Sequence, residues 1–172
     1  MQERPDIGTA WLIKSWAFQR DNEVSKALIA AEKAVECYPE SIRTQDNLGG
    51  LLLKLGQVDK AIEQYKKAVA VNPEAAILHY KLGVLFLKQG SFDQAVGSFT
   101  EAMRAKPGWL EPMNNLAWLY HQQGRFREAE PLYKQARKIK IKAFGNDHPD
   151  VASDLNNLAL LYHDEGRYAE AE

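Results

Sequence analysis

A small set of residues recurs along this chain at an interval of about 34 positions. Residues 76–109 carry the set most regularly, as Leu82, Gly83, Phe86, Gly90, Ala95, Phe99, Ala102 and Pro107. The preceding copy consists of Leu48, Gly49, Leu52, Gly56, Ala61, Tyr65, Ala68 and Pro73. Self-similarity of this kind is typical of stacked helix-turn-helix units, and the closing prolines end helices. The sequence therefore predicts an all-α repeat fold.

This set of residues resembles the tetratricopeptide repeat family, whose fold is a right-handed α-solenoid of antiparallel helix pairs. The resemblance implies a single domain over residues 1–172, with repeats at 8–41, 42–75, 76–109, 110–151 and 152–172. The first repeat is divergent, because Lys14-Ser15 replaces the Leu-Gly pair and Asn22 replaces the turn glycine. Asn tolerates the left-handed conformation better than most residues, so we expect this turn to form.

The fourth repeat is longer than the others. After Leu116-Ala117, the next equivalent pair, Leu158-Ala159, comes 42 positions later, and the extra residues lie within 138–150. Gly145 can end the longer helix, and Asp147-His148-Pro149 opens the next helix with a capping acid and an early proline. Together with the two Asn-Asn-Leu-Ala segments, at 114–117 and 156–159, this part resembles repeats of the kinesin light chain type.

Charge and composition exclude several classes of partner. Among 172 residues, 22 basic and 23 acidic side chains leave a net charge of −1, which does not favour nucleic acid or anionic lipid. An apolar run long enough to span a membrane and a signal peptide are both missing from the sequence, which predicts a cytoplasmic protein. Cys37 is the only cysteine, and we expect it to be a small buried side chain. We expect no cofactor.

The resemblance also indicates which residues line the concave groove of the solenoid. These are polar and aromatic side chains of the first helix of each repeat, namely Asn47, Lys54, Tyr80, Lys81, Lys88, Asn114, Asn115, Trp118, Asn156 and Asn157. An Asn amide both donates and accepts hydrogen bonds, which matches the backbone of an extended peptide. Alternatively, the amides bind neighbouring helices or water, and the two aromatic side chains serve only in packing. Lys81 interrupts the series of Asn residues and suggests a preference for an acidic ligand group.

Other kinds of site have less support. A clamp for a terminal carboxylate, as some three-repeat members of the family have, would find only Asn47 and Lys81 in matching places. His121 and His163 share one place in successive repeats, but nothing at metal-ligand spacing accompanies them. The sequence contains no phosphate-binding loop or nucleophile motif, so we do not expect an enzyme.

The sequence thus favours a scaffold that binds a peptide segment of a partner protein in its groove. One alternative is a regulatory repeat fragment of a larger signalling or catalytic protein. Another is a homo-oligomer formed through an uncapped C-terminal face, since Leu155, Leu158 and Leu161 are expected to lack a partner helix. The last repeat is expected to be incomplete, as in a fragment of a longer array.

Overall fold

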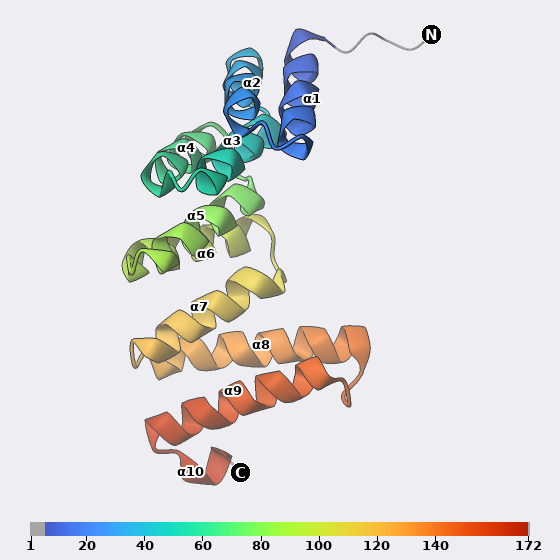
Figure 1. Cartoon of the computed structure of the whole chain (residues 1–172). Helices are drawn as coiled ribbons and strands as arrows, with labels where there is room; N and C mark the ends of the chain where they lie inside the picture. Colours follow the sequence, from blue (N-terminus) through green and yellow to red (C-terminus); the bar gives the residue numbers. More distant parts are fainter. Residues whose placement is uncertain (1–5, 172) are drawn as a thin grey trace. The chain divides into compact units, whose positions relative to one another are not determined.

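The computed structural model describes residues 6–171, and these form α-helices joined by short turns, without strands in this range (Figure 1). The helices are α1 (Ile7–Arg20), α2 (Val24–Cys37), α3 (Ile42–Lys54), α4 (Val58–Val71), α5 (Ala76–Lys88), α6 (Phe92–Ala105), α7 (Leu110–Gln122), α8 (Phe126–Phe144), α9 (Pro149–Glu165) and α10 (Tyr168–Ala171). The predicted all-α class is confirmed. Within the described residues, no helix is both long and apolar enough to cross a membrane.

The chain divides into two compact units, one ending at Leu85 and the other beginning at Phe86, within α5. In unit 1, successive helices from α1 to α4 pack side by side as antiparallel neighbours (Figure 1). In unit 2, the same holds from α6 to α10. Each unit is described separately below.

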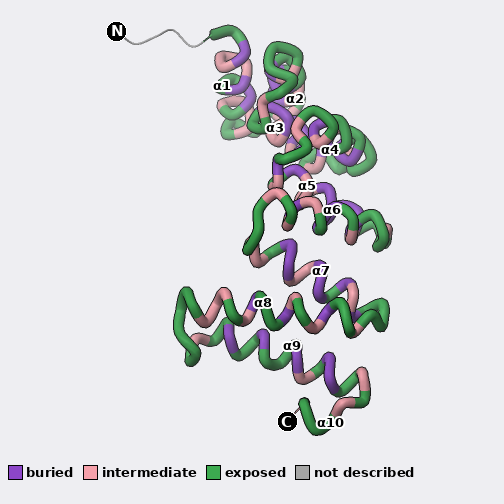
Figure 2. Tube along the Cα trace, turned by 180° about the vertical axis from the view of Figure 1, so that it is seen from behind, coloured by how far each residue is buried: buried purple, intermediate pink, exposed green. Residues whose placement is uncertain are grey.

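Alanines form much of the core where two helices approach each other. In unit 1, Ala27, Ala31, Ala34, Ala61 and Ala68 are completely buried, and in unit 2 Ala95, Ala102, Ala129 and Ala136 are as well. These residues mark the inward side of α2, α4, α6 and α8, where the tube is purple in Figure 2. A methyl group is the largest side chain that such close helix axes accept, so the spacing of the alanines sets the spacing of the helices.

Gly49 is a position in unit 1 where two paired helices approach each other closely. A Cβ atom on Gly49 would lie 2.5 Å from the ring of Tyr65, which is itself fully buried. The ring cannot swing away freely, because the Tyr65 hydroxyl donates a hydrogen bond to Asp46 Oδ1 at 3.1 Å. The same hydrogen bond and burial raise the pKa of Tyr65, with burial as the larger cause.

Turn geometry follows the sequence closely. Asn22 has a φ of 59°, in the left-handed region, as expected from its place at the turn between α1 and α2. Gly56 takes the equivalent place between α3 and α4 with a φ of 71°.

The expectation for Cys37 is wrong, because the side chain is free and exposed. The buried stripe of α2 runs through Ala27, Ala30, Ala31 and Ala34. Cys37 is the last residue of that helix, and the chain turns away at Tyr38 before another turn of the stripe can be covered.

The extra residues of the fourth repeat lengthen two helices. α8 has 19 residues and α9 has 17, against 14 in α6 and 13 in α7. The cap of α9 differs from expectation: His148, and not Asp147, is the N-cap residue, and its Nδ1 accepts a hydrogen bond from the Asp150 N–H at 3.2 Å. Pro149 follows at the first helical position, as expected.

A buried ion pair joins the lengthened parts of α8 and α9. Lys140 Nζ donates to Asp154 Oδ1 at 2.7 Å, and the two side chains are only 11% and 1% exposed. Lys140 Nζ also donates to the Asp150 carbonyl oxygen at 3.3 Å, which ties it to the first turn of α9. Since a buried charge without a partner is costly, this pair fixes how the two helices align.

Glu130 holds α10 and the end of α9 against α8. Its carboxylate accepts hydrogen bonds from Arg167 Nη1 at 2.7 Å, Lys134 Nζ at 2.6 Å and the Tyr162 hydroxyl at 2.9 Å. Chiefly because of the Arg167 and Lys134 bonds, the pKa of Glu130 is lowered to about 2. Of the three leucines expected to lack a partner helix, Leu158 and Leu161 are buried, and only Leu155 is exposed, at 47%.

We predict that Gly49→Ala destabilises the protein, because its new methyl group meets the fixed ring of Tyr65. Overpacking of this kind costs about 1 to 3 kcal/mol, measured as the free energy of unfolding in urea. Gly50→Ala is the matched control, since a Cβ there meets no atom within 4 Å. It should stabilise α3 by up to about 1 kcal/mol. Equal stabilities of the two variants would contradict the proposed close contact.

A second prediction concerns acid stability. A carboxylate with a lowered pKa stabilises the fold above its unfolded value of 4.5, and this contribution is lost as the pH falls toward about 2. Glu130→Gln should therefore lower the free energy of unfolding at pH 7 by about 1 to 3 kcal/mol and flatten its decline below pH 4.5. Glu128→Gln, which removes the exposed pair between Glu128 on α8 and the N-cap residue Arg125, should change it much less, because exposed ion pairs contribute little. Thermal unfolding followed by circular dichroism between pH 7 and about pH 2 would compare the two variants with the unaltered protein. An unchanged acid profile in Glu130→Gln would refute the role of Glu130.

Candidate peptide-binding site

In unit 1, the amide of Asn47 already has partners on α1. Asn47 Nδ2 donates to Ser15 Oγ at 2.8 Å, and Asn47 Oδ1 accepts from Gln19 Nε2 at 2.8 Å. Lys54 Nζ donates to Gln19 Oε1 at 3.2 Å and extends this network along α3. Ser15, which stands in the sequence where other repeats have glycine or alanine, is completely buried. The network joins α1 to α3 and leaves the amide of Asn47 engaged within the protein.

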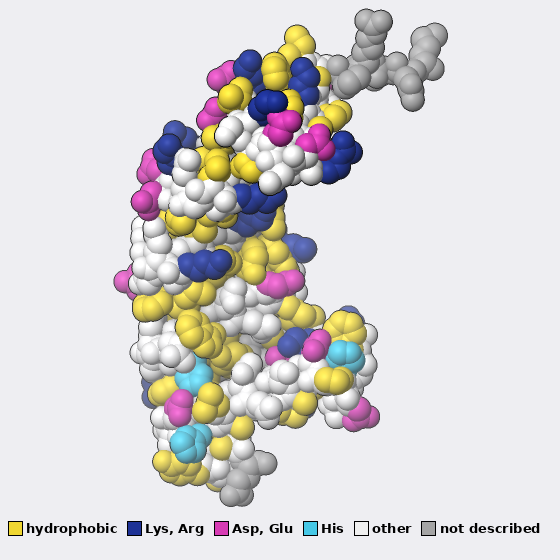
Figure 3. Space-filling view, viewed as in Figure 1, with side chains coloured by type: hydrophobic (Ala, Val, Ile, Leu, Met, Phe, Trp, Pro, Cys, Tyr) yellow, Lys and Arg dark blue, Asp and Glu magenta, His cyan; other side chains and the backbone are white. Residues whose placement is uncertain are grey.

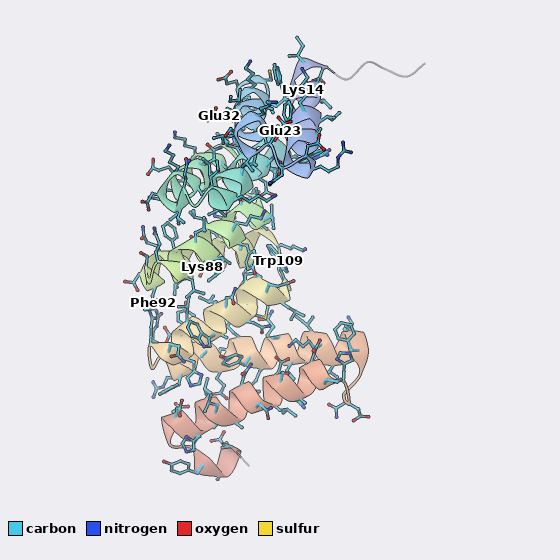
Figure 4. The ribbon with its side chains drawn as sticks, viewed as in Figure 1. Lys14, Glu23, Glu32, Lys88, Phe92 and Trp109 are labelled. Atoms are coloured by element: carbon cyan, nitrogen blue, oxygen red, sulfur yellow. The ribbon has the colours of Figure 1, made fainter. Side chains whose placement is uncertain are left out.

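Lys81 is also paired inside unit 1. Its ammonium group forms an ion pair with Asp46, whose Oδ1 also accepts the Tyr65 hydrogen bond. The sequence suggested that Lys81 binds an acidic group of a ligand. In the structure, Asp46 already offsets the positive charge of Lys81. Tyr80, next to it on α5, is half-buried and has interactions of its own. Lys88 lies exposed at the C-terminal end of α5, where Figure 4 labels it.

In unit 2, the corresponding asparagines have no such partners. Within residues 6–171, the structure shows no hydrogen bond to the side chains of Asn115, Asn156 or Asn157. The Asn114 Oδ1 atom is buried and lacks a partner in the same range. The Asn114 Oδ1 atom is not exposed to a ligand, but the amides of Asn115, Asn156 and Asn157 can form hydrogen bonds with one.

Two exposed apolar side chains accompany these amides. Trp118 follows Asn115 by three residues on α7 and is 44% exposed, and Leu160 follows Asn157 by three residues on α9 and is 54% exposed. Residues three apart on a helix lie on the same face. We call this set the α7–α9 surface, and it consists of Asn114, Asn115, Trp118, Asn156, Asn157 and Leu160.

A histidine and a carboxylate connect the two helices that carry this surface. His121 Nε2 lies 3.0 Å from Asp164 Oδ2, and His163 Nδ1 lies 3.2 Å from Asp164 Oδ1. His121 is buried and packs edge-on against Phe126 and Tyr133, with centroid distances of 5.7 and 6.5 Å. The hydrogen bonds from His163 and His121 hold the pKa of Asp164 below its usual value.

The position of this contact places the asparagines opposite each other. Asn115 precedes His121 by six residues, and Asn157 precedes Asp164 by seven. At about 1.5 Å per helical residue, each Asn lies roughly 9 to 10 Å along its helix from the contact. Because α7 and α9 both run antiparallel to α8, the two amides lie at similar distances along their own helices from this contact (Figure 1). Sequence reasoning noted both histidines but missed Asp164, whose role depends on a neighbour 43 residues away.

The electrostatic character of the α7–α9 surface is nearly neutral. None of its six residues is charged. The charged side chains nearest to them in sequence on α9 are Asp154, which is buried and paired with Lys140, and Asp164, which lies against the two histidines. In Figure 3, most of the visible basic side chains (dark blue) lie over α1 to α5, whereas over α7 and α9 hydrophobic side chains (yellow) are seen together with histidines (cyan) and an acidic side chain (magenta). Of the described residues, no group of three or more His, Cys, Asp or Glu is placed to hold a metal ion.

Comparison with known proteins identifies the repeats. A family model described as tetratricopeptide repeat matches residues 110–172, and one described as TPR repeat matches residues 49–90. A search of curated proteins finds no match.

Solved structures show the same fold. A crystal structure of the MamA protein has a TM-score of 0.78 and 21% identity, over 95% of this chain and 85% of that chain. A crystal structure of YrrB, described as a TPR protein with an unusual peptide-binding site, has a TM-score of 0.74 and 17% identity, over 94% and 79%. At these identities the likeness shows the fold alone, an all-α solenoid. Residues 49–90 and 110–172 of this chain are therefore tetratricopeptide repeats.

Proposed function

We propose that this protein is a protein-interaction scaffold and that its α7–α9 surface binds an extended peptide segment of a partner. The observation that carries the proposal is the contrast between the two units. The Asn47 amide is engaged by Ser15 and Gln19, while the amides of Asn115 and Asn157 are open. Repeats of this family and a structural neighbour with a peptide-binding site support the same interpretation.

The chemistry of the surface suggests how a segment would be held. Each open amide can donate to a peptide carbonyl and accept from a peptide N–H, which requires no particular side chain. Trp118 and Leu160, both about half exposed, would contact apolar side chains of the segment. Since none of its six residues is charged, the surface would favour a neutral, partly apolar segment. Ordering a flexible peptide opposes binding, so the affinity would be on the order of micromolar.

The length of α8 and α9 supports assigning this helix pair to the kinesin light chain type of repeat. The two helices have 19 and 17 residues, Gly145 caps α8 with a φ of 89°, and Pro149 opens α9. This assignment would place the proposed surface on the first helices of two successive repeats.

The proposal predicts that Asn115→Ala with Asn157→Ala weakens peptide binding without loss of helix. A random peptide library displayed on phage supplies ligands for the unaltered protein, and fluorescence anisotropy then measures their affinity for each variant. Two neutral hydrogen-bonding groups should be worth about tenfold or more in affinity. Asn47→Ala is the control and should leave peptide affinity unchanged while lowering the melting temperature, because its amide only joins α1 to α3. Undiminished binding by the double variant would reject the α7–α9 surface as the site.

A second candidate function is self-association through a hollow beside α10. α8, α9 and α10 surround a space of about 660 Å³ whose walls include Ile141, Leu155 and Tyr162. The Arg137 Nε atom at this hollow is buried and lacks a partner within the described residues. The hollow is lined both by apolar side chains and by the charged side chains of Lys134, Lys138 and Glu170, a mixture suited to contact with another polypeptide.

Self-association through this hollow predicts that the mass in solution rises with protein concentration and that Leu155→Asp abolishes the rise. Leu155 is 47% exposed, so an aspartate there should leave the fold intact and oppose only the contact. Sedimentation equilibrium from micromolar to millimolar protein provides the measurement. Ile29→Asp, at an exposed apolar residue of unit 1, is the matched control and should not change the mass. A strict monomer at all concentrations would exclude this function.

A further inference from the structure

A second hollow lies in unit 1, between the first halves of α1 and α3. It has a volume of about 380 Å³, and its lining includes Leu12, Ile13, Trp16, Tyr38 and Arg43. Ile13 and Trp16 are 49% and 40% exposed, so apolar surface is open to a ligand here. We call it the α1–α3 hollow. Its volume is at the small end of ligand sites and suits a small molecule or a single residue.

Most polar groups around the α1–α3 hollow already have partners. Thr44 Oγ1 donates to the carbonyl oxygens of Tyr38 and Ser41, each at 2.8 Å, and Ser41 Oγ accepts from the Thr44 N–H at 3.4 Å. Thr9 Oγ1 and the Thr9 N–H both donate to Asp6. The bond from the Thr9 N–H, with a smaller contribution from Tyr38, holds the pKa of the Asp6 carboxyl group below its usual value. These groups are therefore occupied.

Arg43 differs from its neighbours, because no carboxylate in residues 6–171 pairs with it. Its guanidinium carbon lies 5.0 Å from the centroid of the Trp16 ring. A guanidinium held over an indole ring is restricted in orientation, yet its N–H groups remain available around its edge. Such a group binds a carboxylate through two parallel hydrogen bonds, a geometry that lysine cannot offer.

We propose that the α1–α3 hollow binds a carboxylate carried by a small apolar group. The carboxylate pairs with Arg43, and the apolar group packs against Ile13, Leu12 and the ring of Trp16. Both parts are needed, since an exposed ion pair alone contributes little and the apolar contact alone does not select a charged ligand. Either a free apolar monocarboxylic acid or the apolar terminal residue of a polypeptide supplies this chemistry. The site is separate from the proposed peptide site in unit 2 and does not depend on it.

The test compares phenylacetate with phenylacetamide, which has nearly the same shape but no charge. Titrations followed by NMR would monitor the indole N–H of Trp16 and the Nε–H of Arg43. We expect the acid to bind at least about tenfold more tightly than the amide, because the charge-assisted bond to Arg43 is lost in the amide. Arg43→Gln should remove this preference. Arg20→Gln should retain it, since Arg20 is on α1 but pairs with Asp21 and does not line the hollow.

Arg43 is exposed, so its replacement should not unfold the protein, and circular dichroism would verify this. Equal binding of acid and amide to the unaltered protein would overturn the proposal. So would an acid preference that persists in folded Arg43→Gln. The tripeptide Gly-Gly-Phe with a free carboxylate separates the two sources: tighter binding than phenylacetate indicates a polypeptide terminus, and weaker binding indicates a small acid. Both of these results support the site.

Discussion

The close approach of paired helices is the constraint on which the rest of this structure depends. It is made possible by side chains no larger than a methyl group at one position of each second helix, such as Ala61, Ala95 and Ala129, all fully buried. In unit 1, Gly49 has no side chain, and the ring of Tyr65 packs directly against its backbone. Because small residues gain little from burial individually, stability comes from packing density over many such contacts.

The first helix of each repeat packs against its neighbours through one face. The residues on its opposite face can therefore differ in chemical character from one repeat to the next. The two units use this freedom differently. Unit 1 ties its first helices together with Ser15, Gln19 and Asn47, whereas unit 2 joins α7 and α9 through His121 and Asp164 near their ends. The second arrangement secures the helices at one end and keeps the middle of their surface unoccupied. Similar sequence patterns thus produce surfaces with different capacities to bind.

The fold could be predicted from the sequence because its signals are local. The turn at Asn22, the stop at Gly145 and the start at Pro149 each depend on the conformational preference of one residue. The candidate site could be predicted only in outline. Whether an asparagine is open depends on partners more than 25 residues away, as with Gln19 and Asn47. Burial of Cys37 failed as a prediction because a general tendency of cysteine was applied to the last residue of a helix.

The network around Asn47 also has a calorimetric consequence. A ligand that reached this amide would have to break the bonds to Ser15 and Gln19, and release Lys54 from Gln19, before forming its own. Contact there would take from Ser15, Gln19 and Lys54 the partners that the network supplies, and this loss would offset the gain from the new bonds. An open amide in unit 2 gives up only water. Two asparagines in equivalent places of the repeat would therefore differ in the enthalpy that they contribute to binding.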